Sequence, residues 1–399
     1  MTQKKKPVLR FKGFTDDWEQ RKLGEMLEFR NGFNGSSEIY GGDTPLISVM
    51  DILNNNFITH DKILAHVCVD NNIKERFKIS YGDVLFQRSS ENYEDAGTSN
   101  VYIDRQNNAI FGGFVIAGKK LKEYDPICFK YLLDSKYVRN QIIRKAQGAQ
   151  HINVSQDTLQ NVAIYIPNME EQNKIGAYLH NIDHLITLHQ RKYEKLRNLK
   201  KFFLEKIFPQ NGKRVPEVRF AGFTGDWEQR KIFELFKITR GHVLASPLIS
   251  DTKTGDKPYP VYSSQTKDNG LMGYYKDYLY QDAITWTTDG ANAGTVNYRA
   301  EKFYCTNVCG VLLADKVIPN QMIAEALNKV AKRHVSYVGN PKLMNNVMAD
   351  IEITLPDDEN EQKRISYLFD KIYNLITLHQ RKLEKLQNLK KAALDKMFV

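Results

Sequence analysis

The chain has 399 residues and a mass of 46.1 kDa, more than one ordinary hydrophobic core accommodates, so we expect two or three domains. It is 42% hydrophobic and 26% charged, which excludes an intrinsically disordered chain. The longest apolar stretch, Ala109 to Gly118, is much shorter than the ~20 residues of a membrane-spanning helix. The basic start, MTQKKKPVLR, is not followed by the apolar segment that a secretory signal would have. We therefore expect a cytoplasmic protein with no membrane partner.

The four cysteines are too few and too scattered for a disulfide framework. Cys305 and Cys309 lie in an alternating, strand-like run in which positions i and i+4 share a face. No second Cys/His pair with zinc-ligand spacing accompanies them. We expect ordinary buried thiols and no metal site.

Two blocks of sequence each occur twice. Arg10–Lys22 returns as Arg219–Lys231 with eleven of thirteen positions identical. Leu185–Lys201 returns as Leu375–Lys391 with fifteen of seventeen identical. Such repeats indicate that one structural framework, here called the frame, occurs twice in the chain.

Between the blocks lie two inserts, residues 23–167 and 232–356, which show no obvious sequence match. The order of blocks and inserts predicts two recognition domains and two repeated helices, with the boundaries 1–167, 168–208, 209–356 and 357–399. The net charge of +10 suggests a polyanionic partner. Segments 168–214 and 357–399 together carry +7 of it, which leaves the two inserts almost neutral.

The inserts are predicted to be β-rich with some helix, which gives an α+β fold class. Short β-branched or aromatic runs bounded by turn residues predict strands at Ala109–Ile116, Val162–Pro167 and Ile351–Leu355. Turn signals occur at Asn31-Gly32, Asn34-Gly35, Asn269-Gly270 and Asp289-Gly290. Helices are expected at Pro126–Ala146 and Gln321–Arg333.

Each long block lies in a predicted helix of roughly 36–40 residues, which would be ~55–60 Å long. Apolar residues step by four and three along both helices, as in the a/d seam of a coiled coil. The predicted seam consists of Ile175, Leu179, Ile182, Ile186, His189, Tyr193 and Leu196, and of Ile365, Phe369, Ile372, Ile376, His379, Leu383 and Leu386.

The two helices are expected to pair in antiparallel orientation. A domain of ~150 residues has a radius of gyration of ~15 Å, so its termini do not comfortably span ~60 Å, as parallel pairing would require. Antiparallel pairing relates the two halves by a pseudo-two-fold axis. His189 and His379 then lie near the middle of the seam, where a role as polar register markers is favoured over a chemical one.

Enzyme motifs are largely missing. Gly113–Lys120 mimics a phosphate-binding G-x₄-G-K loop but lacks the Ser/Thr that holds magnesium. No Asn/Asp-Pro-Pro-aromatic tetrapeptide of an amino-methyltransferase occurs; the nearest string, Asn340–Leu343, fails at two positions. The acidic run Pro356–Glu359 is interpreted as a helix cap. We expect no catalytic residue in this chain.

Polar clusters in both inserts have the side chains that contact base edges and phosphates in DNA. Each cluster alone is more often a solvated loop, but each insert has three of them. The candidate DNA-binding residues are Arg88, Ser89, Ser90, Asn92, Arg105, Gln106, Asn108, Gln150, His151 and Asn153 in the first insert, and Ser263, Ser264, Gln265, Lys267, Thr287, Thr288, Asn292, Arg333, Asn340 and Lys342 in the second.

The twin Arg-Phe-x-Gly-Phe-Thr-x-Asp-Trp-Glu-Gln-Arg-Lys openings and the twin Ile-Thr-Leu-His-Gln-Arg-Lys helices resemble those of specificity subunits of type I DNA restriction–modification systems. Tyr259–Ser264 and Thr288–Gly294 also resemble that family's target-recognition domains. The resemblance implies two target-recognition domains, each of which reads one half of a bipartite, asymmetric site in double-stranded DNA. The coiled coil would set the spacer between the halves.

The resemblance also implies partner subunits that carry the catalysis. Two methyltransferase subunits, using S-adenosylmethionine, would dock on the repeated elements, and restriction subunits with motor and nuclease activity would join them and use Mg/ATP. No cofactor is then expected in this chain.

Two alternatives come from other functional classes. A chain that methylates DNA itself would transfer a methyl group without partners, and the missing tetrapeptide argues against it. A coiled-coil adaptor that binds only proteins is favoured by the nearly neutral inserts and predicts no sequence-specific DNA binding.

Overall fold

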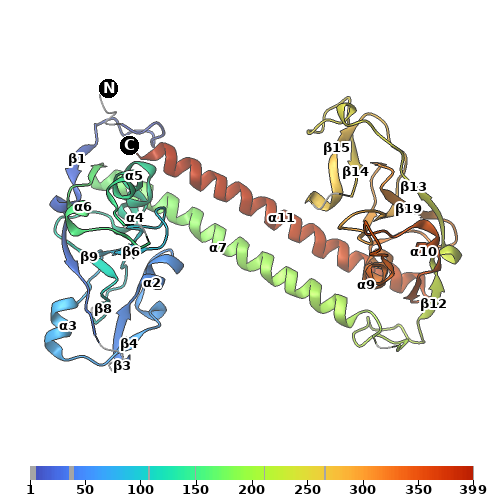
Figure 1. The fold of residues 1–399 in the computed structure, drawn as a ribbon, viewed down its shortest axis with the longest axis horizontal. Coiled ribbons are helices and arrows are strands. Elements are labelled where there is room, and N and C mark those ends of the chain that lie inside the picture. Colours follow the sequence, from blue (N-terminus) through green and yellow to red (C-terminus); the bar gives the residue numbers. More distant parts are fainter. Residues whose placement is uncertain are drawn as a thin grey trace. The chain divides into compact units, whose positions relative to one another are not determined.

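The computed structural model describes residues 6–35, 40–106, 108–148, 150–210, 212–264 and 267–398. The chain forms two compact units, Met1–Gln190 with Arg381–Val399, and Arg191–Gln380. The long helices α7 (Met169–Lys206) and α11 (Glu359–Met397) each contribute their first part to one unit and their last part to the other (Figure 1). The predicted four-segment division, which places each helix in a segment of its own, stays a prediction.

The first unit is built on a frame that the opening block forms with the start of α7. Strand β1 (Glu19–Lys22) pairs antiparallel with β11 (Ala163–Ile166), which directly precedes the helix. Arg10 donates two hydrogen bonds, of 2.6 and 2.7 Å, to the carboxylate of Glu171, whose side chain is fully buried. The indole nitrogen of Trp18 donates to the same carboxylate at 3.2 Å.

The second unit repeats this frame. Strand β12 (Glu228–Lys231) pairs antiparallel with β20 (Glu352–Leu355), and Arg219 donates bonds of 2.7 and 2.8 Å to buried Glu361. The repeated blocks therefore form the same strand pair and the same ion pair, whereas the indole nitrogen of Trp227 has no hydrogen-bond partner among the described residues. A bidentate guanidinium–carboxylate pair fixes orientation as well as charge, so each pair ties an opening block to the first turn of its helix.

The end of the other long helix completes each frame. Phe398, after α11, packs edge-on against Trp18, with ring centroids 6.2 Å apart. Phe208, after α7, packs in the same way against Trp227, also at 6.2 Å. Each core thus includes residues from both long helices.

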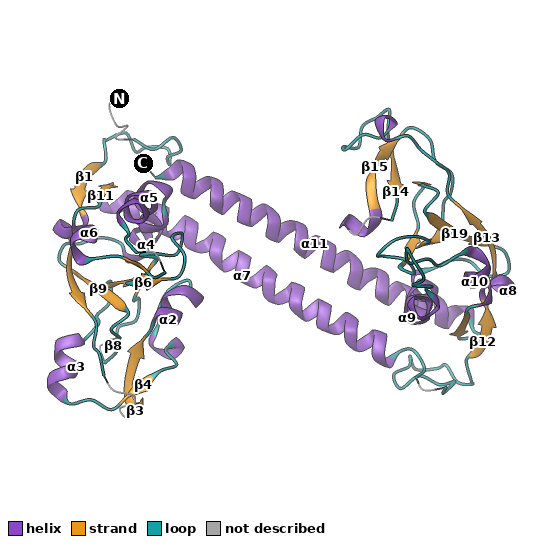
Figure 2. Cartoon of the chain, viewed as in Figure 1, coloured by secondary structure: helices purple, strands orange, loops and turns teal. Residues whose placement is uncertain are grey.

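The two inserts have the same sheet topology although their sequences do not match. One sheet of the first insert has the order β2-β9-β5-β7 and is antiparallel throughout; its counterpart has the order β13-β19-β16-β17. In the other sheet, β3 pairs antiparallel with β4 and parallel with β8, and β14 pairs likewise with β15 and β18. Figure 2 shows the strands of both inserts.

The remaining elements are short. Those of the first unit are α1 (Leu23–Met26), β2 (Leu27–Asn31), β3 (Tyr40–Ile47), α2 (Val49–Asn54), η2 (His60–Lys62), β4 (His66–Val67), α3 (Asn71–Phe77), β5 (Val84–Gln87), β6 (Ser89–Ser90), β7 (Ser99–Val101), β8 (Ile110–Phe111), β9 (Val115–Lys120), α4 (Pro126–Asp134), α5 (Lys136–Lys145), β10 (Ile152–Asn153) and α6 (Gln156–Gln160). Those of the second are α8 (Ile232–Leu235), β13 (Phe236–Arg240), η3 (Ser246–Leu248), β14 (Tyr259–Tyr262), η4 (Lys267–Gly270), β15 (Leu271–Tyr275), β16 (Ala283–Thr287), β17 (Val296–Arg299), β18 (Tyr304–Cys305), β19 (Cys309–Ala314), α9 (Gln321–Ala331), η5 (Lys332–His334) and α10 (Asn345–Asp350).

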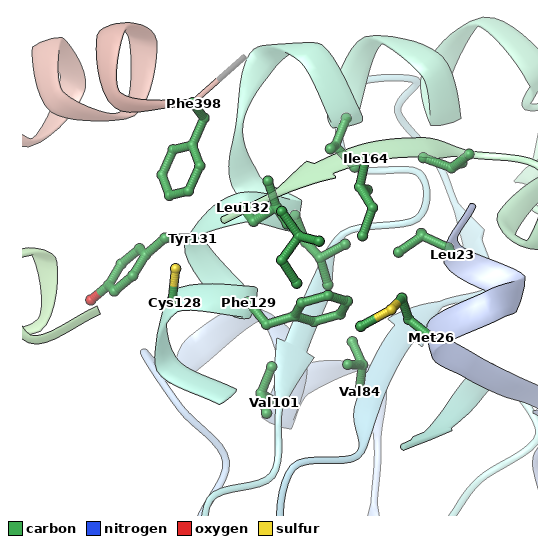
Figure 3. Packing of buried hydrophobic residues seen from close by; sticks show 14 of the residues in the cluster. Leu23, Met26, Val84, Val101, Cys128, Phe129, Tyr131, Leu132, Ile164 and Phe398 are labelled. Atoms are coloured by element: carbon green, nitrogen blue, oxygen red, sulfur yellow. The ribbon is translucent and has the colours of Figure 1, made fainter. Parts of the chain in front are cut away.

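The core of the first unit lies between α4, the antiparallel sheet and the long helices. Its buried side chains include Phe129, Tyr131, Val84 and Val101, and Phe398 reaches it from just after the end of α11 (Figure 3). The second unit has a corresponding core, in which Ile323 and Leu327 of α9 meet Phe369 of α11. The helix that follows the sheet therefore joins each insert to a long helix.

Several predicted elements are divided in the structure. The run Ala109–Ile116 forms β8 and β9 with a turn between them, and Pro126–Ala146 forms two helices because Ser135 caps the second of them. The cysteine run is likewise two strands, with Cys305 ending β18 and Cys309 starting β19. The expectation of one continuous strand through both cysteines was wrong.

The long helices have 38 and 39 residues, within the predicted range. In the first unit they run antiparallel, because Glu171 lies near Trp18 and Phe398 while Asp183, further along α7, contacts Lys390, earlier on α11. All fourteen predicted seam residues are buried or half-buried. Those buried are Ile175, Leu179, Ile182, Ile365, Phe369, Ile372 and Leu383; those half-buried are Ile186, His189, Tyr193, Leu196, Ile376, His379 and Leu386.

The frame makes a prediction about stability. We expect Glu171→Gln to lower the free energy of unfolding by about 3 kcal/mol, because it leaves the mostly buried guanidinium of Arg10 without its counter-charge. The neighbouring Glu170→Gln is the control: its side chain is 74% exposed, and a change within about 0.5 kcal/mol is expected. Urea unfolding of the full chain measures both. Equal effects would contradict a structural role for the buried pair.

Candidate nucleic-acid interface

In the first insert, three loop segments meet at the end of β5. The backbone of Gln87 exchanges hydrogen bonds with Gly97 and Thr98, which closes the loop between them. Arg88 N donates to the carbonyl of Phe114 at 2.9 Å, and its own carbonyl accepts from Val154 N at 2.9 Å. Strand β6 pairs with β10, so that segments 88–97, 112–114, 147–148 and 150–154 form one surface, here called loop cluster 1.

Loop cluster 1 is held in place by hydrogen bonds from a half-buried arginine. Nη2 of Arg139, on α5, donates to the carbonyls of Glu94 and Ala96 at 2.7 and 2.9 Å. Burial lowers the pKa of this guanidinium from its ordinary value, and the carbonyl bonds offset part of the desolvation cost. Gly97 in this loop has φ +64°, a conformation that favours glycine. The loop is therefore positioned by the scaffold.

Seven of the predicted residues of the first insert lie in loop cluster 1. Arg88 is half-buried, with Nη1 3.4 Å from the carbonyl of Gly113, and Ser90 is buried. Ser89 is half-buried, directly opposite Asn153 in the β6–β10 pair. The exposed members are Asn92, Gln150, His151 and Asn153.

The other three predicted residues, Arg105, Gln106 and Asn108, are exposed but lie elsewhere. Strand β7 runs antiparallel to β5, so the segment after β7 returns to the beginning of β5. There the Arg105 guanidinium lies 5.9 Å from the ring of Tyr81, and Tyr102 donates to the carbonyl of Gln106 at 2.6 Å. The predicted residues of this insert therefore lie on two surfaces, at opposite ends of β5.

The second insert has an equivalent surface at the end of β16. The backbone of Thr287 exchanges hydrogen bonds with Gly294 and Thr295, as Gln87 does with its loop. Thr288 N donates to Val308 O at 3.0 Å, and Leu343 N donates to Thr288 O at 2.8 Å. Gly294 has φ +80°, matching Gly97. Segments 262–264, 287–295, 306–308 and 332–343 form this surface, loop cluster 2.

Loop cluster 2 contains nearly all the predicted residues of the second insert that the structure describes. Ser263 and Ser264 are half-buried, and Nδ2 of Asn292 donates to the carbonyl of Ser264 at 3.0 Å. Thr287 and Thr288 are buried, so their side chains position the loop and do not face solvent. The exposed members are Arg333, Asn340 and Lys342. Gln265 and the side chain of Lys267 lie outside the described residues.

Both surfaces also have exposed apolar side chains, which were not among the residues predicted from the sequence. Phe114 is 71% exposed at the turn before β9, and Tyr93 is 50% exposed, with its hydroxyl donating to the carbonyl of Gly148 at 2.9 Å. On loop cluster 2, Tyr337 is 71% exposed and Val338 92%. Exposed aromatic rings offer flat faces for stacking on bases. Phe114 was hidden within a predicted strand, although the glycines before it signalled a turn.

The two surfaces differ in charge. Loop cluster 2 presents Lys332, Arg333 and Lys342, and its acidic Asp289 lies 3.9 Å from Lys342 Nζ. Loop cluster 1 presents Arg88 beside three acids, which are Glu91, Glu94 and Asp95. Equivalent scaffolds thus carry different donor and acceptor patterns, as expected of two surfaces that recognise different ligands.

The described residues hold no group of three or more His, Cys, Asp or Glu side chains placed to bind a metal ion. The string that mimics a phosphate-binding loop is occupied by β9, an extended strand with no cradle. The acidic run before α11 acts as a cap, since Asp358 accepts a hydrogen bond from Asn360 N at 2.7 Å.

The sequence profile described as type I restriction modification DNA specificity domain matches residues 15–198 and, again, residues 224–388. The chain belongs to this family of type I specificity subunits. The resemblance of its repeated blocks to that family is thereby confirmed, and the two matches coincide with the two copies of the frame.

Relatives of this specificity subunit include the N-terminal part of a protein of Mycoplasma pneumoniae that is named as a type I specificity subunit. It is 40% identical over 137 residues, which are 33% of this chain and 71% of the relative. A protein of Methanocaldococcus jannaschii, named as the MjaX specificity subunit, is 23% identical over 95% of this chain and 92% of its own.

The crystal structure of the S subunit of a type I restriction–modification system from M. genitalium superposes with a TM-score of 0.71. The match covers 99% of both chains at 15% sequence identity, which shows a shared fold. The predicted α+β fold class, with two β-rich domains and a repeated long helix, is confirmed. No helix in the described ranges is long and apolar enough to cross a membrane.

The cysteines of the specificity subunit give a chemical prediction. Burial raises the pKa of Cys309 to about 11 and raises the pKa values of Cys305 and Cys128, whereas Cys68 is exposed. At pH 8 a thiol of pKa 11 is only about 0.1% thiolate. We expect Ellman's reagent to label one thiol rapidly in the folded chain and three only on unfolding. Cys68→Ser should abolish the rapid phase; rapid labelling of two or more thiols would contradict the burial.

Proposed function

We propose that this chain is the non-catalytic DNA-sequence specificity subunit of a type I restriction–modification enzyme, in which each insert reads one half of a bipartite, asymmetric site in double-stranded DNA. The observation that carries the proposal is the presence of two loop clusters at equivalent strand ends, with unlike side chains on like scaffolds. A duplicated frame supplies two reading surfaces, and the differing loops make the two half-sites different.

The exposed side chains have the chemistry that reads DNA. Arg and Lys donate to guanine, and Asn and Gln pair with adenine through their amides. Arg333, Asn340 and Lys342 in one cluster and Gln150, His151 and Asn153 in the other are exposed at loop tips. The exposed rings of Phe114 and Tyr337 add surfaces that stack on bases or wedge between them.

The long helices act as the spacer between the two reading surfaces in this proposal. Both are uninterrupted, with 38 and 39 residues, and α-helices of this length are stiff on the scale of a DNA site. A ruler of fixed length would hold the half-sites a fixed number of base pairs apart.

The repeated helices also offer like docking surfaces for two methyltransferase subunits. Leu185, Leu188 and Leu199 of α7 are 41%, 38% and 39% exposed. Their counterparts Leu375, Leu378 and Leu389 are 42%, 45% and 43% exposed. Exposed leucines at matching positions of a duplicated helix fit a partner that binds twice. In this proposal S-adenosylmethionine belongs to those partners, Mg/ATP belongs to restriction subunits, and this chain holds no cofactor.

The deciding experiment is single-molecule sequencing of the source genome, with and without the gene, scored for N6-methyladenine. The proposal expects a split motif with methylated adenines on both strands that is lost on deletion. If methylation is unchanged although the complex is expressed, the proposal fails and a protein-only adaptor becomes the better explanation.

The ruler role predicts the effect of lengthening both helices. One heptad inserted before Ile186 and one before Ile376 adds about 10.5 Å of helix, or roughly three base pairs of DNA. We expect the spacer of the methylated motif to grow by about three base pairs while both half-sites stay unchanged. Seven Gly/Ser residues inserted after Lys213, outside both helices, serve as the control and should leave the spacer as it is.

Base reading by loop cluster 2 predicts the effect of Lys342→Ala. If its ammonium meets a base edge, binding of the methyltransferase–specificity complex should lose ~1–3 kcal/mol at one base pair and keep its other preferences. The first cluster offers the parallel test with Arg88→Ala in the other half-site. Lys276→Ala is a matched control, since Lys276 also lies 3.9 Å from an aspartate, Asp277, but beyond the opposite end of β14. Equal losses for both lysines at every sequence would indicate phosphate contact only.

A further inference from the structure

The repeated helices are nearly identical in one part and divergent in another. From Leu185 and Leu375 onward, fifteen of seventeen positions are the same, but in the sixteen positions before them, 169–184 and 359–374, only four are. Most of the divergence therefore lies in the first part of each helix, and a shorter divergent stretch follows the shared block, at residues 202–206 and 392–396. The first turns of each long helix pack against the helix of the preceding insert, α4 in the first unit and α9 in the second.

The first buried position at which the two helices differ is 176, the counterpart of 366. A Cβ on Gly176 would lie 2.5 Å from Oδ1 of Asp125 and 2.9 Å from Cys128 N, so any side chain here would collide with the first turn of α4. Helix α4 begins with Pro126, which has no N–H. The first residue of α4 therefore has no N–H that needs an acceptor from position 176. Glycine at this position lets α7 approach the start of α4 closely.

In the second unit the same position carries Ser366. Helix α9 begins with Gln321, whose free N–H would otherwise be one of the unsatisfied donors of a helix start. It donates to Oγ of Ser366 at 3.1 Å, and Ser366 is only 7% exposed. Glycine therefore faces the helix that begins with proline, and serine faces the helix whose first residue has a free N–H. In both units the residue on the long helix suits the first residue of the insert's helix.

A second position of divergence is 183, counterpart of 373, which lies two turns further along the same face. In the first unit the hydroxyl of Tyr131, on α4, donates to Oδ2 of Asp183 at 2.7 Å. Lys390 of α11 lies 2.7 Å from Oδ1 of the same carboxylate and 5.5 Å from the Tyr131 ring. The insert supplies the tyrosine and the long helix supplies the acid.

In the second unit the tyrosine and the acid change places. Tyr373 is on the long helix, and its hydroxyl donates to Oε1 of Glu325, a buried residue of α9. Lys200, the repeat counterpart of Lys390, lies 4.0 Å above the Tyr373 ring. Burial lowers the pKa of Lys200, and the charge of Glu325 opposes this shift. Each unit thus has one tyrosine, one acid and one lysine, with the first two exchanged between insert and helix.

We infer that positions 176 and 183 of α7, and 366 and 373 of α11, match each long helix to the insert that precedes it, so that the two inserts are not interchangeable between the two positions of the chain. The inference concerns assembly of the chain and does not depend on DNA recognition. It also places the end of each exchangeable module within the helix, after residue 184 or 374, and not at the strand that precedes the helix.

The mismatch that an exchange would create follows from the contacts. The second insert before α7 would bring Glu325 to Asp183, with Lys390 as the lone cation for two carboxylates, a costly arrangement for buried charges. It would also leave Gln321 N–H without the serine acceptor. The first insert before α11 would bring Tyr131 to Tyr373, leave Lys200 without its acid and press Ser366 into the first turn of α4.

The test is a pair of full-length chimeras. In the first, residues 23–167 and 232–356 change places and the helices are untouched. The second has the same exchange together with Gly176→Ser, Asp183→Tyr, Ser366→Gly and Tyr373→Asp. All other contacts are the same in both, including those with the ends of the long helices, so that the four positions alone distinguish the chimeras.

We expect the uncorrected chimera to melt at least about 5 °C below the corrected one. Equal melting temperatures, or a lower value for the corrected chimera, would overturn the inference.

The native chain provides an independent test if neither chimera folds. Gly176→Ser should lower the melting temperature by at least about 4 °C, although serine is the better helix former, and Ser366→Ala by about 3 °C, although alanine is better still. Ala177→Ser, at the exposed next position of α7, should change it by about 1 °C or less. Stabilisation by either Gly176→Ser or Ser366→Ala, as helix propensity alone predicts, would overturn the inference.

Discussion

The rest of the structure depends on the ion pair between the opening block and the first turn of each long helix. The carboxylates of Glu171 and Glu361 are buried, and each is neutralised by one arginine in bidentate geometry. A buried carboxylate without that partner would be strongly destabilising, so the opening block cannot detach from the helix at low cost. In each unit the ion pair lies beside a strand pair, β1 with β11 or β12 with β20, and each insert begins after the first strand and ends at the second. Everything between those strands is an insert on a fixed base.

This arrangement explains how inserts without sequence similarity keep one topology. Strand pairing uses backbone groups, which every sequence has, and the apolar alternation that holds the sheets together is met by many combinations of side chains. The loops at the end of β5 and β16 are closed by equivalent backbone hydrogen bonds, from Gln87 in one and Thr287 in the other. These backbone hydrogen bonds do not depend on the identity of the exposed side chains. The exposed side chains can therefore differ between the two units, as the proposed reading of two different half-sites requires.

The long helices combine constant and variable parts in the same way. Their shared heptads have exposed leucines at matching positions, while their first turns differ where they meet α4 and α9. At the first of these contacts, the missing N–H of Pro126 is matched by the missing side chain of Gly176, and the free N–H of Gln321 by the hydroxyl of Ser366. Small differences of this kind in a buried contact are large in free energy, because an unsatisfied donor or a steric overlap has no solvent to relieve it.

The sequence by itself determined the repeated blocks, the two long helices and the fold class, because repeats and heptads are periodic and depend on local spacing. It also indicated many of the residues in the two loop clusters by type. Only the tertiary structure showed that Arg105 lies apart from Arg88, that Thr287 and Thr288 are buried, and that Phe114 is exposed. Strand direction decides which loops meet, and the sequence does not give it. Only the structure revealed that Asp183 and Tyr373 exchange roles, because each partner lies about fifty residues away and no spacing in the chain records that contact.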